Sequence, residues 1–224
     1  MYTPPFNAVR DEAEIRAMVA AFRTAWLVTA DEDGVPAATL LPILWHGDVV
    51  IAHLAKANPQ WRGIADDAPA LLIAGGPEAY ISPSWYAAKT EHGKVVPTWN
   101  YSAVHLTGTV RLHHNSDWLR RAVTDLTDAH ETGRDHPWQV TDAPEPYIDS
   151  QLNGIVGIEF AVTRVEAKAK LSQNRSEADQ AGVITGLHAE RLDPPHAAAA
   201  ATVADAMNRP VGAAVVADPG PRGQ

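Results

Sequence analysis

The sequence contains no cysteine and no long apolar run. Without cysteine the chain forms no disulfide and offers no thiolate as a nucleophile or metal ligand. None of its apolar runs approaches the roughly 20 residues that a membrane-spanning helix needs. Its first residues, MYTPPFNAVRDEAEIR, lack the basic and then apolar order of a signal peptide. We therefore expect a cytoplasmic protein without a membrane segment.

Positive charge is scarce and is not clustered along the chain. The sequence has 18 Lys and Arg residues against 27 Asp and Glu residues, which gives a formal net charge of −9. Proteins that bind nucleic acids usually present a basic face to the phosphates. The composition therefore argues against direct nucleic-acid binding.

The common catalytic and nucleotide-binding motifs are absent too. The sequence has no GxGxxG, GxxxxGK or GxSxG segment. Ten histidines are present, but their spacing does not match that of metal ligands, so no metal site is expected. The catalytic residues stay unidentified; His53 and His92 are the candidates for acid–base chemistry.

The elements that are present favour short antiparallel strands. Apolar spacing predicts an amphipathic helix over 11–23. A hairpin is predicted from the segment AWLVTA, the turn DEDG and the segment VPAATLLPILW. A tight turn and another strand are predicted from HGDVVIAHL. ALLIA predicts a strand that ends at Gly75-Gly76-Pro77.

Two later strands carry finer detail. Over 104–112 apolar and polar residues alternate, and Gly108 falls on the apolar face, where a close backbone approach would suit it. Over 155–168 the apolar phase changes near Val165, which suggests a bulge or bend. We expect a mainly β fold, an antiparallel split β-barrel with flanking α-helices.

Helix signals and a change of composition complete the outline. Ser116, Asp142 (with Glu145 for a capping box) and Ser176 are predicted N-caps. Beyond about residue 188 the sequence is rich in Ala and Pro. We expect one domain over 1–187 and a weakly packed C-terminal tail over 188–224, with one possible helix at 196–208.

Three stretches attract attention for chemistry. HLAKANPQW (53–61) joins a cation to a capped helix start, which is a natural anion site. YISPSWYAAKTEHGKVVPTWNY (80–101) reads as an aromatic loop, and KLSQNR (170–175) is dense in hydrogen-bond donors. Each also has a plain structural explanation, namely a cap with a solvated lysine, an aromatic mini-core and a polar turn. Together they suit a flat phosphorylated cofactor.

Five stretches of the chain also resemble, in order and spacing, the PaiB-type FMN-binding negative transcriptional regulators. They are HLAKANPQW, AYISPSWY, EHGKVVPTWNY, HLTGTVRL and KLSQNR…EADQAGVITGL. The resemblance runs over about 1–187. It implies a split β-barrel related to pyridoxamine-phosphate oxidases and flavin reductases, which are homodimers with FMN at the subunit interface. This chain has Lys56 where the family more often has Arg, and Ala169 where it has a bulky aromatic residue.

The resemblance implies a set of FMN-binding residues and their roles. Lys56 and Asn58, with His53 nearby, would meet the phosphate, and Thr39, Leu41 and Pro42 would run beside the isoalloxazine ring. The other residues expected at the flavin are Trp99 and Asn100, which would come from the partner subunit, and Lys170, Ser172, Gln173 and Asn174, which would close the site.

The expected function is flavin-dependent redox chemistry on a small molecule, or flavin-linked regulation. One alternative is a PaiB-like transcriptional repressor that acts without direct DNA contact, through a protein partner. Another is a flavin-free module of the same fold, for instance one that holds haem. The family resemblance implies a homodimer with FMN at the subunit interface.

Overall fold

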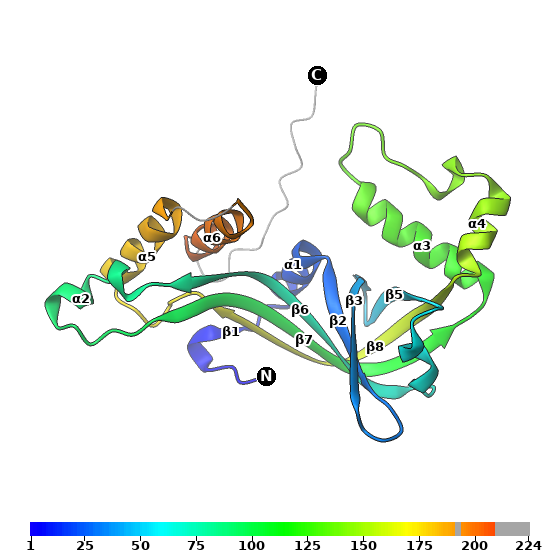
Figure 1. Cartoon of the computed structure of the whole chain (residues 1–224), viewed down its shortest axis with the longest axis horizontal. Coiled ribbons are helices and arrows are strands. Elements are labelled where there is room, and N and C mark those ends of the chain that lie inside the picture. Colours follow the sequence, from blue (N-terminus) through cyan, green and yellow to red (C-terminus); the bar gives the residue numbers. More distant parts are fainter. Residues whose placement is uncertain (191–193, 209–224) are drawn as a thin grey trace. The chain divides into compact units, whose positions relative to one another are not determined.

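The computed structural model of the chain describes residues 1–190 and 194–208 (Figure 1). The strands are β1 (Ala8–Val9), β2 (Thr24–Ala30), β3 (Pro36–Pro42), β4 (Leu44–His46), β5 (Val49–Ala55), β6 (Ala68–Ile81), β7 (Thr98–His113) and β8 (Ile155–Lys170). The α-helices are α1 (Glu12–Phe22), α2 (Ala88–Glu91), α3 (Ser116–Glu131), α4 (Glu145–Leu152), α5 (Glu177–Ala189) and α6 (Pro194–Met207). The 3₁₀ turns are η1 (Pro5–Asn7), η2 (Pro59–Gly63), η3 (Pro83–Trp85) and η4 (Val140–Asp142).

The strands form one sheet in the order β3-β2-β6-β7-β8-β5-β4, and β1 pairs with β8. Every pair whose register is defined is antiparallel, including β2 with β3 and β5 with β8. β3 stands at one end of this order, yet it also contacts β5, near the other end. Such a contact arises when a sheet curls towards a barrel. The expectation of a mainly antiparallel β fold with flanking helices is confirmed.

The first hairpin forms where the sequence predicts it. Asp31 Oδ1 accepts hydrogen bonds from the backbone N–H groups of Asp33 (3.1 Å) and Val35 (2.8 Å). Gly34 has φ +79°, a left-handed value that glycine adopts without steric strain. The turn aligns β2 with β3 so that Trp26 lies opposite Leu40.

The aromatic stretch 80–101 is more regular than expected. β6 continues through Gly75-Gly76-Pro77 to Ile81, so the predicted end of that strand is wrong. The stretch also contains η3 and α2, and its last residues belong to β7, which begins at Thr98. The sequence pattern misleads here because neighbouring strands of the sheet support a backbone that local propensity alone does not hold extended.

Two of the three predicted helix caps are wrong. Asn115, one residue before Ser116, accepts from the Trp118 N–H at 3.0 Å and caps α3. Asp142 forms its capping box with Gln139 around η4, whereas α4 begins after Pro144 without a side-chain cap. Ser176 does cap α5, since its Oγ accepts from the Asp179 N–H at 3.2 Å.

β7 and β8 show the predicted faces in most positions. Val104, Leu106 and Val110 are buried on one face of β7, together with Gly108. In β8 the burial of Val156, Ile158 and Phe160 gives way to burial of the consecutive residues Ala167 and Lys168, which fits a change of phase. Val165 itself is exposed, contrary to expectation.

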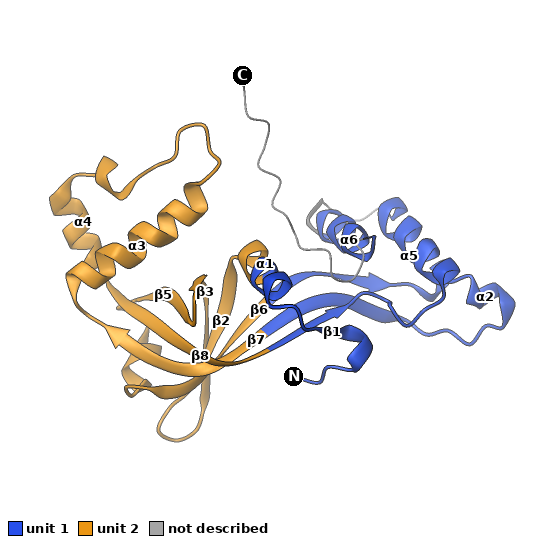
Figure 2. Ribbon diagram, turned by 180° about the vertical axis from the view of Figure 1, so that it is seen from behind, with its two compact units in different colours: residues 1–18, 75–104, 166–215 blue, residues 19–74, 105–165, 216–224 orange. Residues whose placement is uncertain are grey.

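The described chain divides into two compact units (Figure 2). The first unit comprises residues 1–18, 75–104, 166–190 and 194–208. The second comprises 19–74 and 105–165. The second unit has its own apolar core, formed by Leu27, Val50, Leu54, Leu72, Leu106, Val110, Val156, Ile158 and Phe160.

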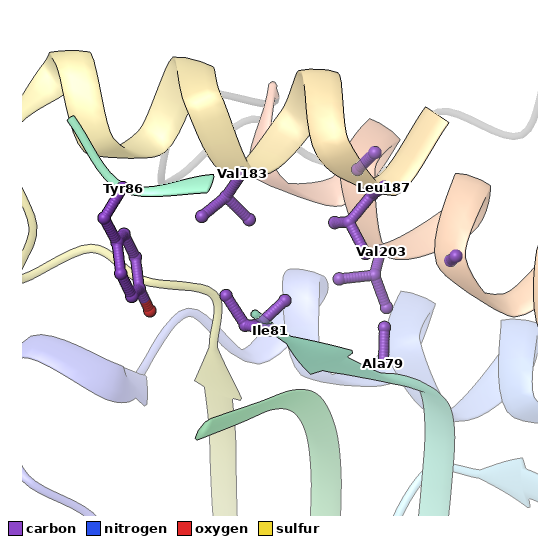
Figure 3. Close-up of a cluster of buried hydrophobic side chains, with 8 residues drawn as sticks. Ala79, Ile81, Tyr86, Val183, Leu187 and Val203 are labelled. Carbon is purple, nitrogen blue, oxygen red and sulfur yellow. The ribbon is translucent and has the colours of Figure 1, made fainter. Parts of the chain in front are cut away.

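The core of the first unit lies between strand β6 and helices α5 and α6. Ile81 and Val183 are fully buried, and Leu187 and Val203 pack beside them (Figure 3). Helix α6 therefore belongs to this core, so the expected weak packing of the tail is wrong for this helix. Most of it coincides with the predicted segment 196–208. The tail residues 191–193 and 209–224 lie outside the described residues.

Candidate functional site

Thr39, Asn58 and Gln60 form a hydrogen-bonded cluster in the second unit, beside β3. Asn58 Oδ1 accepts from the Gln60 N–H at 2.9 Å and caps η2. The Asn58 side-chain amide donates to Thr39 Oγ1 at 2.9 Å, and Thr39 Oγ1 donates to Gln60 Oε1. An amide nitrogen carries two hydrogens, so Asn58 keeps one N–H for a ligand.

Gln60 anchors this cluster to the hairpin. Its Nε2 lies within hydrogen-bonding distance of Leu27 O (3.1 Å), Thr29 Oγ1 (3.0 Å) and Ala37 O (3.2 Å). A cavity of about 300 Å³ opens beside it. The residues that line the cavity are Thr29, Ala30, Asp31, Ala37, Ala38, Thr39, Asn58, Pro59, Gln60 and Gly63.

Lys56 is held by its backbone and exposed at its side chain. Its N–H donates to Gly154 O at 2.8 Å, and its carbonyl oxygen accepts from Trp61 Nε1 at 3.0 Å. Its Nζ donates to Asn153 O at 3.3 Å. This arrangement fixes the base of a cation whose end is accessible to an anion.

The helix beside Lys56 differs from the one expected. η2 is a five-residue 3₁₀ turn, too short to sum its peptide dipoles into a strong positive end. The positive charge available to an anion here is therefore that of side chains, Lys56 and Arg62, and not that of the turn.

Of the remaining residues predicted in this unit, Leu41 is buried and Pro42 is exposed at the end of β3. His53 lies on β5 opposite Gly157. Its Nδ1 is buried and has no hydrogen-bond partner in the described part of the chain. Burial lowers the pKa of His53 from its ordinary value of 6.5, so the neutral imidazole prevails at neutral pH.

The first unit brings most of the other predicted residues together around β7 and the end of β8. The Asn100 side-chain amide is buried and donates to Ser172 Oγ at 3.1 Å. Lys170 Nζ donates to Thr98 Oγ1 and to the Trp99 carbonyl oxygen. Ser172 has φ +64°, so the chain turns sharply there.

Gln173 and Trp99 have different surroundings. The Gln173 side chain folds back on its own turn, where its Oε1 accepts from the Leu171 N–H at 2.8 Å and its Nε2 donates to Ala169 O. The Trp99 indole is 51% exposed and meets the Tyr80 ring edge-on, with 6.0 Å between the ring centroids. About half of Trp99 is therefore open to its surroundings, and Gln173 shapes the turn.

A second cavity, of about 320 Å³, lies in this unit. Its walls include the predicted residues Asn100, Lys170, Ser172 and Asn174. The wall also contains Arg175 and Tyr86, which belong to the two stretches singled out in the sequence, and Lys168 and Tyr2, which were not expected from the sequence. Lys168 and Lys170 are two residues apart on a strand and share one face, which was a readable signal.

The predicted site residues thus fall into two sets. Thr39, Leu41, Pro42, His53, Lys56 and Asn58 belong to the second unit, and Trp99, Asn100, Lys170, Ser172, Gln173 and Asn174 to the first. No group of three or more His, Asp or Glu side chains that could hold a metal ion occurs among the described residues. None of the described helices is long and apolar enough to cross a membrane.

The comparisons with known proteins agree with the resemblance seen in the sequence. The family model described as "Putative FMN-binding domain" matches residues 1–164. The protease synthase and sporulation protein PAI 2 of Bacillus subtilis is 36% identical over 194 residues, which cover 85% of this chain and 90% of that protein.

Two solved structures have a similar fold. The FAD- and haem-binding protein of Mycobacterium smegmatis aligns with a TM-score of 0.58 and 17% identity, over 78% of this chain and 79% of that one. The flavocytochrome Anf3 of Azotobacter vinelandii aligns with a TM-score of 0.53 and 17% identity, over 79% of this chain and 75% of that one. The sheet described above therefore matches a split-barrel-like fold.

Proposed function

Because the chain belongs to the FMN-binding-domain family, we propose that it is a homodimeric flavoprotein whose FMN carries out redox chemistry on a small molecule. The cavity beside Thr39 and Asn58 carries this proposal, and the exposed cation Lys56 precedes Asn58 by two residues in the chain. Bound FMN supplies an acceptor and donor of electrons, so the protein needs only to bind, orient and shield the reactants.

The residues of the second unit fit such a cofactor. Lys56 offers an exposed ammonium for the phosphate, and Asn58 retains one amide N–H. β3 stands at the end of the sheet order, so the outer side of its backbone is not paired with another described strand. Backbone groups at such an edge suit the polar rim of a flat ring. Thr39, Leu41 and Pro42 belong to this strand.

His53 has a limited role in the proposed function. Its neutral imidazole sits beside the Lys56 segment and adds no positive charge for the phosphate. The buried, unpartnered Nδ1 can accept or donate one hydrogen bond when a ligand group approaches. His92, the other acid–base candidate, is exposed, and its Nδ1 already accepts from the Lys94 N–H at 3.0 Å.

The homodimer is supported by an exposed apolar pair on the β2–β3 hairpin. Trp26 and Leu40 lie opposite each other, and each is 48% exposed. A second copy of the chain would remove this apolar surface from water. We propose further that Trp99 of the partner subunit and Asn100 of the partner subunit approach the flavin, together with the partner's Lys170, the partner's Ser172, the partner's Gln173 and the partner's Asn174.

A regulatory role has one observation in its favour, which is that the Bacillus subtilis relative is named for protease synthesis and sporulation and not for a reaction on a small molecule. The net charge of −9 favours regulation through a protein partner over direct contact with DNA. Redox chemistry stays the leading proposal because the proposed cofactor is itself a redox group.

The absorption spectrum of the purified protein, before and after incubation with FMN, tests the proposal. We expect flavin bands that remain with the protein on gel filtration, bleaching by NADH or NADPH under nitrogen, and a dimer in analytical ultracentrifugation. A protein that stays colourless with FMN would refute the flavin assignment. A haem spectrum in its place would identify the flavin-free alternative.

The dimer has its own variant. Trp26→Glu places a charge on the proposed interface and is expected to yield monomers that lose FMN. The control is Tyr147→Glu, which alters a 56% exposed aromatic residue on α4. A Trp26→Glu protein that remains dimeric would show that the dimer interface lies on another surface.

A further inference from the structure

Three cations line the cavity of about 320 Å³ in the first unit: Lys168, Lys170 and Arg175. The wall contains no carboxylate among the residues that the structure describes. The whole chain has 18 Lys and Arg residues and a net charge of −9. Three cations around one cavity of such an acidic protein therefore form a local site of opposite charge.

Lys168 is the most confined of the three. Its side chain belongs to a residue that is only 6% exposed. Its Nζ donates to the Tyr101 hydroxyl at 2.8 Å and to Tyr2 O at 3.3 Å, and both partners are neutral. A buried ammonium without a counter-charge is unfavourable, so an anion in the cavity would offset the desolvation of this group.

Lys170 and Arg175 extend the positive surface. The hydrogen-bond acceptors of Lys170, Thr98 Oγ1 and Trp99 O, are also neutral. Burial lowers the pKa of Lys170. The electrostatic interaction with Tyr101 raises this pKa, and the charges of Lys168 and Arg175 lower it. An anion close to these cations would relieve their mutual repulsion.

The Arg175 guanidinium lies 4.6 Å from the centre of the Tyr86 ring. The carboxylate whose charge also acts on Tyr86, that of Asp179, is buried and accepts from the Ala88 N–H at 3.0 Å. Asp179 is not part of the cavity wall. The ring contact holds the guanidinium in place at the cavity wall.

The other walls are apolar or aromatic. They include Tyr2, Pro4, Phe6, Tyr86, Val96 and Pro97, while Asn100, Ser172 and Asn174 add neutral hydrogen-bonding groups. A cavity of this size with mostly apolar walls and a few convergent polar groups is typical of small-molecule sites. An inorganic ion would contact the cations and the polar groups but would bury none of the apolar wall surface.

We propose that this cavity binds a small organic anion, an apolar or aromatic molecule with a carboxylate or phosphate group, through Lys168, Lys170 and Arg175. The anionic group meets the three cations, and the apolar body packs on Tyr2, Phe6 and Tyr86. The site is distinct from the FMN phosphate site at Lys56. Because Lys170, Ser172 and Asn174 of its wall are also proposed to approach the partner's flavin, the bound anion would lie beside that flavin, and this placement rests on the proposed function.

Isothermal titration calorimetry on the FMN-loaded full-length protein tests this site. The probes are benzoate, phenyl phosphate and benzamide, the last being a neutral molecule of the same shape as benzoate. We expect saturable binding of benzoate or phenyl phosphate, with FMN still bound, and no binding of benzamide. The tighter of the two anions identifies the preferred anionic group.

Variants then assign the binding to the cavity. Lys168→Met and Arg175→Gln should each weaken the binding of the anion about 10-fold or more, the loss expected for one charge-assisted hydrogen bond. Lys94→Gln, which changes an exposed lysine of the same unit outside the cavity wall, should bind as the wild type does.

Several results would overturn the proposal. Equal binding of benzamide and benzoate, or no binding of either anion, would show that the cations do not form an anion site. Unchanged affinity in a folded Arg175→Gln protein would place the anion elsewhere. Release of FMN by the anion would show that the cavity is the flavin's own phosphate site. If Lys168→Met fails to fold, the comparison of benzoate with benzamide in the wild-type protein still shows whether binding requires the negative charge.

Discussion

Gly108 on β7 lies so close to Ala161 on β8 that a β-carbon at Gly108 would stand 2.0 Å from the Ala161 carbonyl oxygen. The same β-carbon would stand 2.6 Å from the ring of Phe160, which is fully buried. Real carbon and oxygen atoms do not approach so closely. The two strands can therefore take this path only with glycine at position 108.

We predict that Gly108→Ala strongly destabilises the fold. The backbone of Ala161 cannot move away without disturbing β8, so we expect the free energy of unfolding to fall by about 3 kcal/mol or more. Gly75→Ala is the matched control, because a β-carbon at Gly75 would meet no atom within 4 Å. Urea denaturation of both variants measures the difference, and a Gly108→Ala protein as stable as Gly75→Ala would contradict the close approach.

Lys56→Ala should weaken FMN binding without loss of stability. Removal of the ammonium deletes a charge-assisted hydrogen bond to the phosphate, worth roughly 1.5–3 kcal/mol or about 10- to 100-fold in Kd. Fluorescence quenching of FMN by the apoprotein measures the Kd. Arg121→Ala, which removes an exposed cation from α3, should leave the Kd unchanged. Wild-type affinity in Lys56→Ala would refute the phosphate assignment.

His53 should make the protein less stable at mildly acidic pH. Its pKa is lowered in the folded state, so below the ordinary value of 6.5 the unfolded chain takes up a proton that the folded chain does not. The free energy of unfolding therefore decreases as the pH falls from 6.5 through the folded-state pKa. In His53→Gln this part of the decrease should disappear. Denaturation curves of both proteins between pH 5 and 8 provide the test, and parallel pH profiles would count against it.

Helix α6 should contribute to the stability of the first unit. Val203 is buried between α6 and the rest of its core, so Val203→Asp places an uncompensated charge there and should cost on the order of 3–5 kcal/mol. Thr202→Asp puts the same group on the exposed side of the same helix and should change stability by no more than about 0.5 kcal/mol. Equal thermal unfolding of the two variants would mean that α6 is not docked in solution.

Local patterns in the sequence were sufficient for the elements that depend on near neighbours. The DEDG turn, the alternation of Val104, Leu106 and Val110 and the cap at Ser176 appear as predicted. Five motifs in register were likewise sufficient to identify the family. These features depend on backbone preferences and on the order and spacing of residues along the chain, which a sequence displays directly.

The tertiary structure alone decided features that depend on distant residues. It continued β6 through Gly75-Gly76-Pro77, docked α6 in a core and reduced the expected helix at Pro59 to a 3₁₀ turn. It also placed Lys168 in the cavity wall beside Asn100 and Ser172. Strand pairing and packing set these outcomes, because they bring together side chains about 70 residues apart whose nearness leaves no trace in local spacing.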